Sequence, residues 1–380
     1  MKRGWCFWGI LLFLCMGSVE LSVHAAGTMN LTEDFLEELN LGEIDDTLSE
    51  VMDGNQFHFM TAVKQLISGE IPFSWETVKE LAANALFAEM AQQKNTAVYI
   101  LILVIVAAIF TNFASVFEQS QVSDVSFYMM YLLLFTILMK AFYAMSQMTA
   151  DTLEHVLTFM KLLIPSYFLA TTFASGSLTG AAFYEFTLIL ITLIQWILKY
   201  AVLPAINLYV LFSMLNYLTK EEYLSKMADL LKTFVGWTLK TVAASAIGFQ
   251  TVQYLILPAV DALKTTIMNK AAEAIPGVGN IFSGATAIVL GSAVLIRNAL
   301  GVAGLILLVL ICLVPFIKLG ACTLLYKAMA AVIQPVSDKR MMECVESIGE
   351  GAAMLMRVLL TTGVLFFISL AMATASIQGR

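Results

Sequence analysis

The stretch IPSYFLATTFASGSLTGAAFYEFTLILITLIQWILKYAVLPAINL (164–208) sets the architecture, because a second stretch 111 residues later shares its landmarks. Pro204 follows Pro165 by 39 residues, and Pro315 follows Pro276 by the same interval. Ungapped alignment of the two stretches gives identical Ile, Pro, Ala, Gly, Ala, Pro, Ile and Leu residues. A proline inside an apolar helix frees a carbonyl that a neighbour must satisfy, so matched prolines are costly coincidences. The pattern predicts a duplicated membrane unit, with similar composition of unrelated apolar segments as the alternative.

The duplication divides the membrane part into two repeats, residues 151–260 and residues 261–380. Each repeat is expected to contain an entering segment, an apolar hairpin interrupted by a proline, and a closing helix. The hairpins are expected at 181–219 and 285–333. Residues 261–284 contain lysines, a glutamate and glycines, which make a poor lipid-facing helix. That segment spans, re-enters or lies at the interface, so parallel and inverted repeats both stay open.

Composition excludes a soluble globular protein. The 380 residues are 59% hydrophobic and 13% charged, with a mean hydropathy of +0.83. Two membrane helices, at 97–117 and 125–147, are expected before the repeats, within residues 95–150. The predicted fold class is all-α: a polytopic membrane helical bundle with two internal repeats and a small N-terminal extracytoplasmic helical segment.

The N-terminal region has the character of an exported segment. A basic pair (2–3), a short apolar stretch and VHAA (23–26) predict that residues 1–26 are a secretory signal peptide, with a retained helix as the alternative. Residues 27–94 carry thirteen acidic residues and three lysines, and are expected to form an acidic helical segment. The positive-inside bias places this acidic segment outside the cytoplasm. The basic residues of loops 220–232 and 334–350 favour the cytoplasmic side.

Ionisable residues inside apolar runs are candidates for a polar path or a subunit interface, because a charge at a helix centre costs about 2.5–3.5 kcal/mol on insertion scales. Snorkelling near helix ends is the alternative explanation. The candidates are Glu185, Arg297, Lys140, Lys161, Lys318 and Arg357, of which the first two lie early in the two expected hairpins. Prolines that break helices and glycines that allow close packing form a second set. Its members are Pro165, Pro204, Pro276, Gly277, Gly279, Pro315, Gly301 and Gly304.

Motifs for catalysis and cofactor binding are missing. The segment PGVGNIFSGAT (276–286) lacks the third glycine of a dinucleotide fingerprint and the lysine of a P-loop. Cys312, Cys322 and Cys344 have no metal-ligand spacing, and no HExxH or GxSxG sequence occurs. The sequence therefore predicts no enzyme, no cofactor, no metal site and no nucleic-acid partner.

Five stretches carry a resemblance to a known family. They are LLIPSYFLATTFASG (162–176), AAFYEF (181–186), VLPAINL (202–208), IPGVGNIFSGAT (275–286) and KAMAAVIQP (327–335). With the order of signal peptide, acidic segment and polytopic domain, the chain resembles the stage III sporulation protein AE family of endospore-forming bacteria over nearly its whole length. The resemblance implies a multipass protein of the mother-cell membrane around the engulfed forespore. It supplies no catalytic residues.

Two functions from different classes remain open. The resemblance implies a component of a secretion-like export or channel complex, needed for forespore development after engulfment. Its implied partners are other stage III sporulation membrane proteins, ring-forming proteins, a cytosolic ATPase and membrane lipid. The alternative is an autonomous secondary transporter of a small solute, with its site between the repeats.

Overall fold

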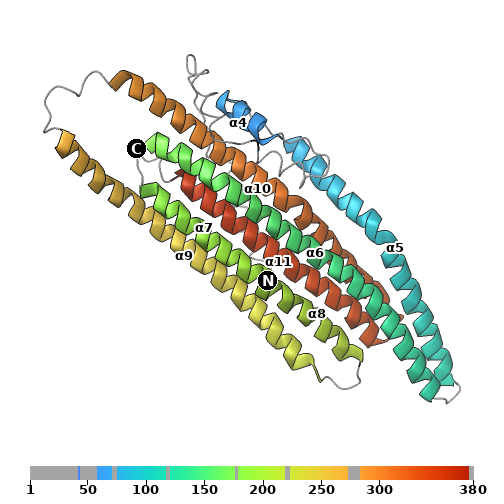
Figure 1. Cartoon of the computed structure of the whole chain (residues 1–380). Helices are drawn as coiled ribbons and strands as arrows, with labels where there is room; N and C mark the ends of the chain where they lie inside the picture. Colours follow the sequence, from blue (N-terminus) through green and yellow to red (C-terminus); the bar gives the residue numbers. More distant parts are fainter. Residues whose placement is uncertain are drawn as a thin grey trace.

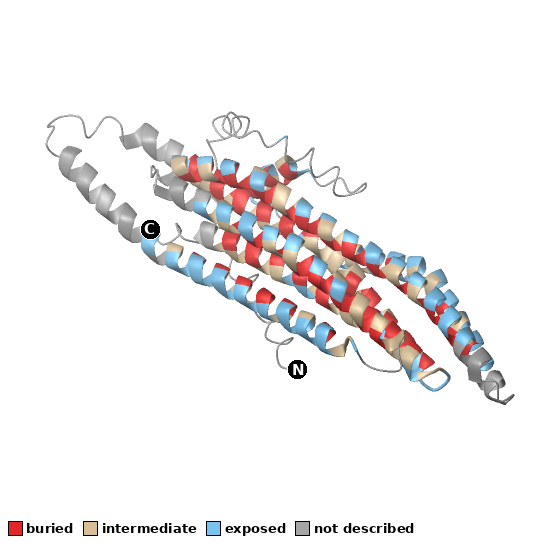
Figure 2. Cartoon of the chain, turned by 60° about the horizontal axis from the view of Figure 1, so that its bottom comes forward, coloured by how far each residue is buried: buried red, intermediate tan, exposed pale blue. Residues whose placement is uncertain are grey.

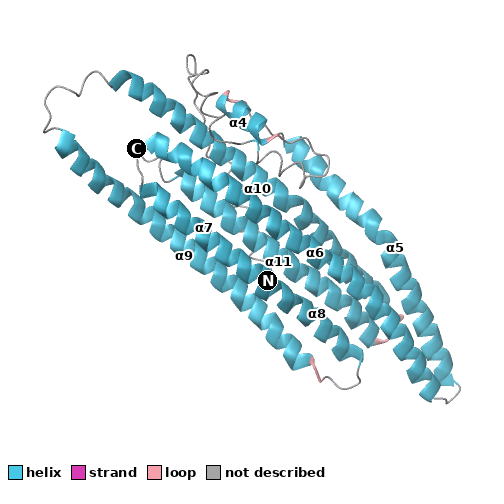
Figure 3. Cartoon of the chain, in the orientation of Figure 1, coloured by secondary structure: helices cyan, strands magenta, loops and turns pink. Residues whose placement is uncertain are grey.

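The computed structural model describes Gly42 and residues 58–70, 75–116, 120–175, 179–218, 223–272 and 283–375. Within these residues every regular element is a helix and no strand occurs (Figure 3). The predicted all-α fold class is therefore confirmed. The expected signal peptide and half of the acidic segment lie outside the described residues, as do Pro276, Gly277 and Gly279.

Long helices run back and forth along a common axis, in the order of the chain (Figure 1). Helices α5, α8 and α10 end at one end of the bundle, whereas α6, α9 and α11 end at the other (Figure 1). The elements are α4 (Phe59–Ile67), α5 (Trp75–Val116), α6 (Ser120–Ser175), α7 (Thr179–Ile197), the π-helix η1 (Leu198–Val202), α8 (Leu203–Leu218), α9 (Ser225–Ala272), α10 (Ser283–Ile333) and α11 (Lys339–Ala375). α7, η1 and α8 follow one another without a break and form a single rod.

Helix α11 lies at the centre of the bundle, because it packs on α6, α7, α8, α9 and α10, whereas α10 packs on α11, α6, α5 and α4. One apolar core joins α5, α6, α8, α9, α10 and α11 around residues such as Leu138, Ile206 and Leu355. A second core joins α4 to α6, α10 and α11, and in it Phe59 packs edge-on against Phe159 with ring centroids 6.3 Å apart. α4 is thus fastened to the membrane bundle by its apolar side.

Five helical rods are long and apolar enough to cross a membrane. These described stretches are Glu76–Phe110, Val125–Thr172, Phe186–Leu218, Gly291–Ile333 and Lys339–Ala371. The protein is therefore a multipass membrane protein by length and composition. α9 is not among these stretches, although it packs against α7 and α8.

The hairpins expected at 181–219 and 285–333 are wrong, because each stretch forms one continuous rod. α6 likewise joins the two helices expected at 125–147 and 153–174, so the predicted boundary at residue 150 falls inside a helix. Apolar and small residues at these places carry no strong turn signal, and side-chain packing keeps the helix going.

The prolines do not end their helices. Pro165 lies inside α6 and Pro315 lies inside α10, so the expectation of helix breaks at these two positions is wrong. A proline removes one hydrogen bond, which a helix packed on its neighbours tolerates. Pro204 is the second residue of α8 and directly follows η1, whose wider turn accommodates the missing N–H group. The internal duplication itself stays a prediction.

Candidate functional site

The predicted intramembrane ionisable residues are not gathered around one cavity. Arg297 is buried in α10, with 1% of its surface exposed, and Lys318 is half-buried on the same helix. The side chain of Glu185 lies outside the described part of the chain. The exposed members of the set are Lys140, Lys161 and Arg357.

Arg297 is only partly satisfied inside the bundle. Its Nε and Nη2 atoms donate to Asn298 Oδ1 at 3.3 and 3.0 Å, whereas Nη1 has no hydrogen-bond partner. Two helical turns away, Gly304 faces α6 and α11, since a Cβ there would lie 2.7 Å from Leu163 and 3.0 Å from Leu370. α10 runs opposite to both neighbours, so Arg297 lies toward their C-terminal ends, where helix dipoles favour a cation.

A three-helix polar cluster is centred on Glu350 of α11. Lys232 of α9 pairs with Glu350 Oε2 at 2.8 Å, and the Tyr209 hydroxyl of α8 donates to the same oxygen. Lys232 also lies 5.7 Å from the centre of the Tyr209 ring. The cluster therefore fastens the beginning of α9 to α8 and α11. The sequence analysis missed it because Glu350 was placed in a loop, whereas it lies on a helix.

Two further polar contacts join helix pairs. Lys199 pairs with Glu154 at 2.7 Å and links the α7–α8 rod to α6. Glu89 of α5 is buried and accepts a hydrogen bond from the Cys322 thiol of α10 at 3.2 Å. Carboxylates buried between helices resist separation, because a separated carboxylate would face hydrocarbon. Neither Glu89 nor Glu154 stands inside a long apolar run, which is why sequence reasoning passed over them.

These contacts fall at similar heights in the bundle. A Cβ on Gly351 of α11 would lie 2.6 Å from Phe142 of α6, so these two residues lie at the same position along the bundle axis. Gly349 is also close to the Thr323–Lys327 turn of α10, which places that turn at about the same position. Glu154 is twelve residues beyond Phe142, so the contacts occupy about 18 Å along the axis. We call this set the polar belt; it comprises Glu89, Glu154, Lys199, Lys232 and Glu350. The predicted candidates Lys140, Lys318 and Arg357 form no ion pair with another described residue and do not belong to it.

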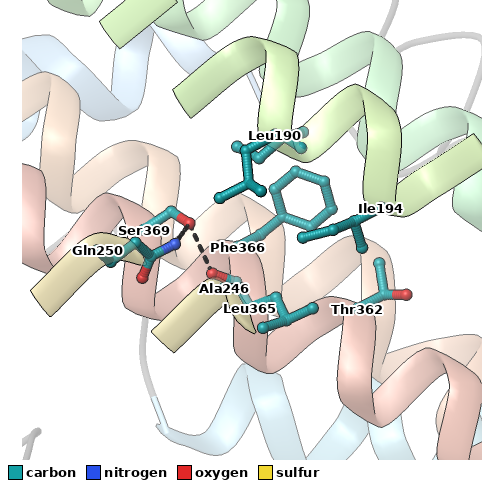
Figure 4. Close-up of a pocket in the computed structure, with 9 residues that line it drawn as sticks. Leu190, Ile194, Ala246, Gln250, Thr362, Leu365, Phe366 and Ser369 are labelled. Atoms are coloured by element: carbon teal, nitrogen blue, oxygen red, sulfur yellow. Dashed lines mark hydrogen bonds between the residues drawn. The ribbon is translucent and has the colours of Figure 1, made fainter. Parts of the chain in front are cut away.

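A polar seam joins α9 to α7 and α11 on the side of the belt away from the α8–α9 connection. Gln253 Nε2 donates to Thr187 Oγ1 at 3.1 Å, and Gln250 Nε2 donates to Ser369 Oγ. Figure 4 shows Gln250 facing Ser369 beside a small cavity that Leu190 and Phe366 also line. The oxygens Gln250 Oε1 and Thr362 Oγ1, both of residues that line the cavity, have no hydrogen-bond partner in the described structure.

Two of the predicted packing glycines, Gly301 and Gly304, lie inside the bundle, whereas Gly277 and Gly279 fall outside the described residues. Gly304 leaves no room for a side chain between Leu163 and Leu370, and Gly301 is buried one turn away. The tightest glycine was not predicted: a Cβ on Gly351 would lie 2.5 Å from Val210 Cγ2. A missing side chain at this position lets α11 approach α6 and α8.

The turn between α10 and α11 is held by a charged pair. The Asp338 carboxylate accepts hydrogen bonds from the backbone and guanidinium of Arg340, and the guanidinium stacks 3.8 Å from the ring centre of Phe127 on α6. Burial opposes ionisation of Asp338, but the hydrogen bonds from Arg340 outweigh it and lower the carboxyl pKa below its ordinary value. The pair therefore ties this turn to the start of α6.

Chemically, the described side chains hold helices together and offer few reactive groups. Among these residues no group of three or more His, Cys, Asp or Glu side chains could hold a metal ion. Cys322 and Cys344 are buried, and Cys312 is partly buried. The fold and its interhelix charges define a polytopic helical membrane protein.

The chain belongs to the stage III sporulation protein AE family, which matches residues 57–376. It is 24% identical over 381 aligned positions to stage III sporulation protein AE of Bacillus subtilis (strain 168), covering 96% of this chain and 95% of the relative. No solved structure matches the chain. The resemblance seen in the sequence is thereby confirmed, and with it a role in sporulation.

Proposed function

We propose that the protein is a membrane component of a secretion-like export or channel complex that links mother cell and forespore and is required for forespore development after engulfment. Family membership supports the sporulation role. The observation that carries the assembly role is the use of charge: in the described structure, the polar belt joins helix to helix and lies apart from the cavity beside the polar seam. Such an arrangement suits a rigid scaffold that works through partners, and no catalytic step is proposed for it.

The proposed location is the mother-cell membrane around the forespore, with the N-terminus extracytoplasmic after signal cleavage. The proposed partners are other stage III sporulation membrane proteins, ring-forming proteins and a cytosolic ATPase of the same complex. α4 supports contact on the extracytoplasmic side, because it fastens the acidic segment to α6 and α10.

Photo-crosslinking from residues 30–90 in sporulating cells tests these partners. The expected result is capture of stage III sporulation proteins that appears only after engulfment begins. Capture that is identical in vegetative cells engineered to produce the protein alone would contradict the proposal.

A second candidate is an autonomous secondary transporter of a small solute. The polar seam is the observation that points to it, because Gln250 Oε1 and Thr362 Oγ1 have no partner beside a cavity. That cavity is about the size of one water molecule, so a solute could bind there only after the seam opens. Solute uptake by the purified protein in liposomes, lost in Gln250→Leu and kept in Thr251→Leu on the exposed side of α9, would establish the transporter and displace the assembly role.

A further inference from the structure

α9 is a long helix whose outer side is not covered by any other described residue. It packs on α7, α8 and α11 through a narrow row of buried residues, whereas most of its circumference is exposed (Figure 2). The row includes Ala228, Val235, Val242 and Ala246. α9 is also absent from the stretches apolar enough to span a membrane, although it lies alongside several of them. Its outer side carries exposed large apolar residues, among them Leu230, Phe234 and Trp237, together with polar ones.

The outer face of α9 combines small, hydroxyl and cationic side chains with large apolar ones. It consists of the exposed residues Leu230, Thr233, Phe234, Trp237, Lys240, Thr241, Ala244, Ser245 and Gly248. None of the described acidic residues forms an ion pair with Lys240. A lysine on the lipid side of a helix is disfavoured, whereas small residues three or four apart let another helix approach closely. A protein surface with a carboxylate at the height of Lys240 would satisfy both features.

Such a surface exists on the same chain, on α6 and α7. We call it the acidic face; it consists of the exposed residues Tyr143, Gln147, Asp151, Glu154, Trp196 and Tyr200. Glu154 is already paired with Lys199, whereas Asp151 accepts only a hydrogen bond from Gln147 at 2.9 Å. None of the described basic residues forms an ion pair with Asp151. Within the acidic face, the Asp151 carboxylate is therefore available to form an ion pair with a second molecule.

The two unpaired charges lie at the same height. Lys232 reaches Glu350, the neighbour of Gly351, which packs against Phe142 of α6. Lys240 lies eight residues beyond Lys232, about 12 Å, and Asp151 lies nine residues beyond Phe142, about 13 Å. α6 and α9 run in the same direction (Figure 1), so both steps lead toward the same end of the bundle.

A second comparison of the two heights, counted from contacts nearer the opposite end of the bundle, agrees with the first. Gln250 bonds to Ser369, and the adjacent Leu370 lies beside Gly304 together with Leu163 of α6. Counting back ten residues from Gln250 reaches Lys240, and counting back twelve from Leu163 reaches Asp151, about 15 and 18 Å. The heights of the two charges therefore match to within about one helical turn.

We infer that the outer face of α9 binds the acidic face of a second copy of this chain, with Lys240 of one copy paired to Asp151 of the next. Each copy offers both faces, and the contact joins two different surfaces, so it is head to tail and can repeat around an axis parallel to the helices. The pair would be shielded from lipid by Trp237 on one copy and by Trp196 and Tyr200 on the other. This association does not depend on sporulation partners.

Cysteine crosslinking in membranes of vegetative cells tests the contact with the full chain. The double variant Lys240→Cys with Asp151→Cys is oxidised, and a non-reducing gel is expected to show a ladder of dimers, trimers and larger species. Each single variant is expected to stay monomeric on the gel. A control pairs Lys240→Cys with Leu324→Cys on a different helix, α10, where this residue is 71% exposed, and is expected to give no ladder.

Exchanging the two charges between positions 240 and 151 gives a second test. It remains informative even if a single variant folds poorly, because the combined variant is expected to restore binding. Lys240→Asp and Asp151→Lys alone are each expected to lower the co-purification of two differently tagged copies by about tenfold, and the combination is expected to restore it. Absence of a ladder with unchanged co-purification would overturn the inference. So would a dimer from Lys240→Cys alone, which indicates a two-fold α9–α9 contact, or a crosslink only to a different protein.

Discussion

Single residues decide how closely the helices approach. Gly351 is the clearest case, because Val210 and Phe142 occupy the space where its side chain would be. Gly236 of α9 offers a comparison, since a Cβ added there meets nothing within 4 Å. The two glycines therefore separate the effect of packing from the effect of helix propensity.

Gly351→Ala is expected to lower the free energy of unfolding by about 1–3 kcal/mol, because Phe142 and Val210 must shift to make room. Gly236→Ala is expected to raise it by about 0.5–1 kcal/mol, through the helix propensity of alanine alone. Thermal unfolding of the purified protein in one detergent measures both. Equal effects of the two substitutions would contradict the packing assigned to Gly351.

The Glu350 cluster is a contact between partly exposed groups, with 46% of the Lys232 side chain and 36% of the Glu350 side chain accessible. The pair is therefore expected to contribute only about 0.5–1 kcal/mol. In a double-mutant cycle of Lys232→Gln and Glu350→Gln, a coupling in that range is expected, with faster hydrogen exchange at the start of α9 in both single variants. Zero coupling would show that the contact does not hold α9.

At the scale of elements, the α10–α11 turn carries a pH dependence. The pKa of Asp338 is lowered in the folded protein, so its ionised form stabilises the turn above the ordinary carboxyl pKa of 3.8. That contribution is lost as the pH falls through the lowered folded pKa. The protection of the turn against hydrogen exchange, relative to the intrinsic amide rate at each pH, is expected to be unchanged at pH 5 and to fall only in stronger acid. Asp338→Asn should remove this acid dependence; an unchanged profile would assign it to another group.

The sequence predicted the type of secondary structure better than the residues at which the helices begin and end. Apolar composition indicated membrane helices, and every described element is a helix. The proline signals were read as interruptions, yet Pro165 and Pro315 lie inside continuous helices. Neighbouring helices offset the single hydrogen bond that a proline removes, and that compensation comes from tertiary packing, which a local pattern does not report.

The candidate site was predicted in part, for a similar reason. Arg297 and Gly304 stood out because a charge or a glycine in an apolar run is conspicuous, and both are buried. Glu89, Glu350 and Asp151 lie in mixed sequence, where acidic residues are ordinary. Whether these residues join helices depends on which helix packs against them. The alignment of two packed helices cannot be predicted from the sequence of either helix alone.

At the scale of the whole molecule, the arrangement of the helices determines whether distant segments lie on the same side of the membrane or on opposite sides. α4 packs beside the ends of α6 and α11, whereas the α10–α11 turn lies at the opposite end (Figure 1). Residues ahead of α4 and residues of that turn are therefore expected on opposite sides of the membrane. The basic residues Lys339 and Arg340 favour the cytoplasm for the turn.

Cysteine labelling tests this orientation. In intact protoplasts, a membrane-impermeant reagent is expected to label Ser49→Cys, whereas Ser337→Cys is labelled only after lysis. A low background is expected, because Cys322 and Cys344 are buried, Cys312 is partly buried, and Cys6 and Cys15 fall in the expected signal peptide. Labelling of both sites before lysis, or of Ser337→Cys alone, would overturn the proposed topology.

The proposed requirement for forespore development is tested most directly by removing the protein and following sporulation in single cells. A deletion strain is expected to grow normally, to complete engulfment, and then to arrest with failing forespore gene expression. Wild-type protein supplied in the mother cell should restore heat-resistant spores. A deletion strain that forms heat-resistant spores at the wild-type frequency would contradict the proposed function.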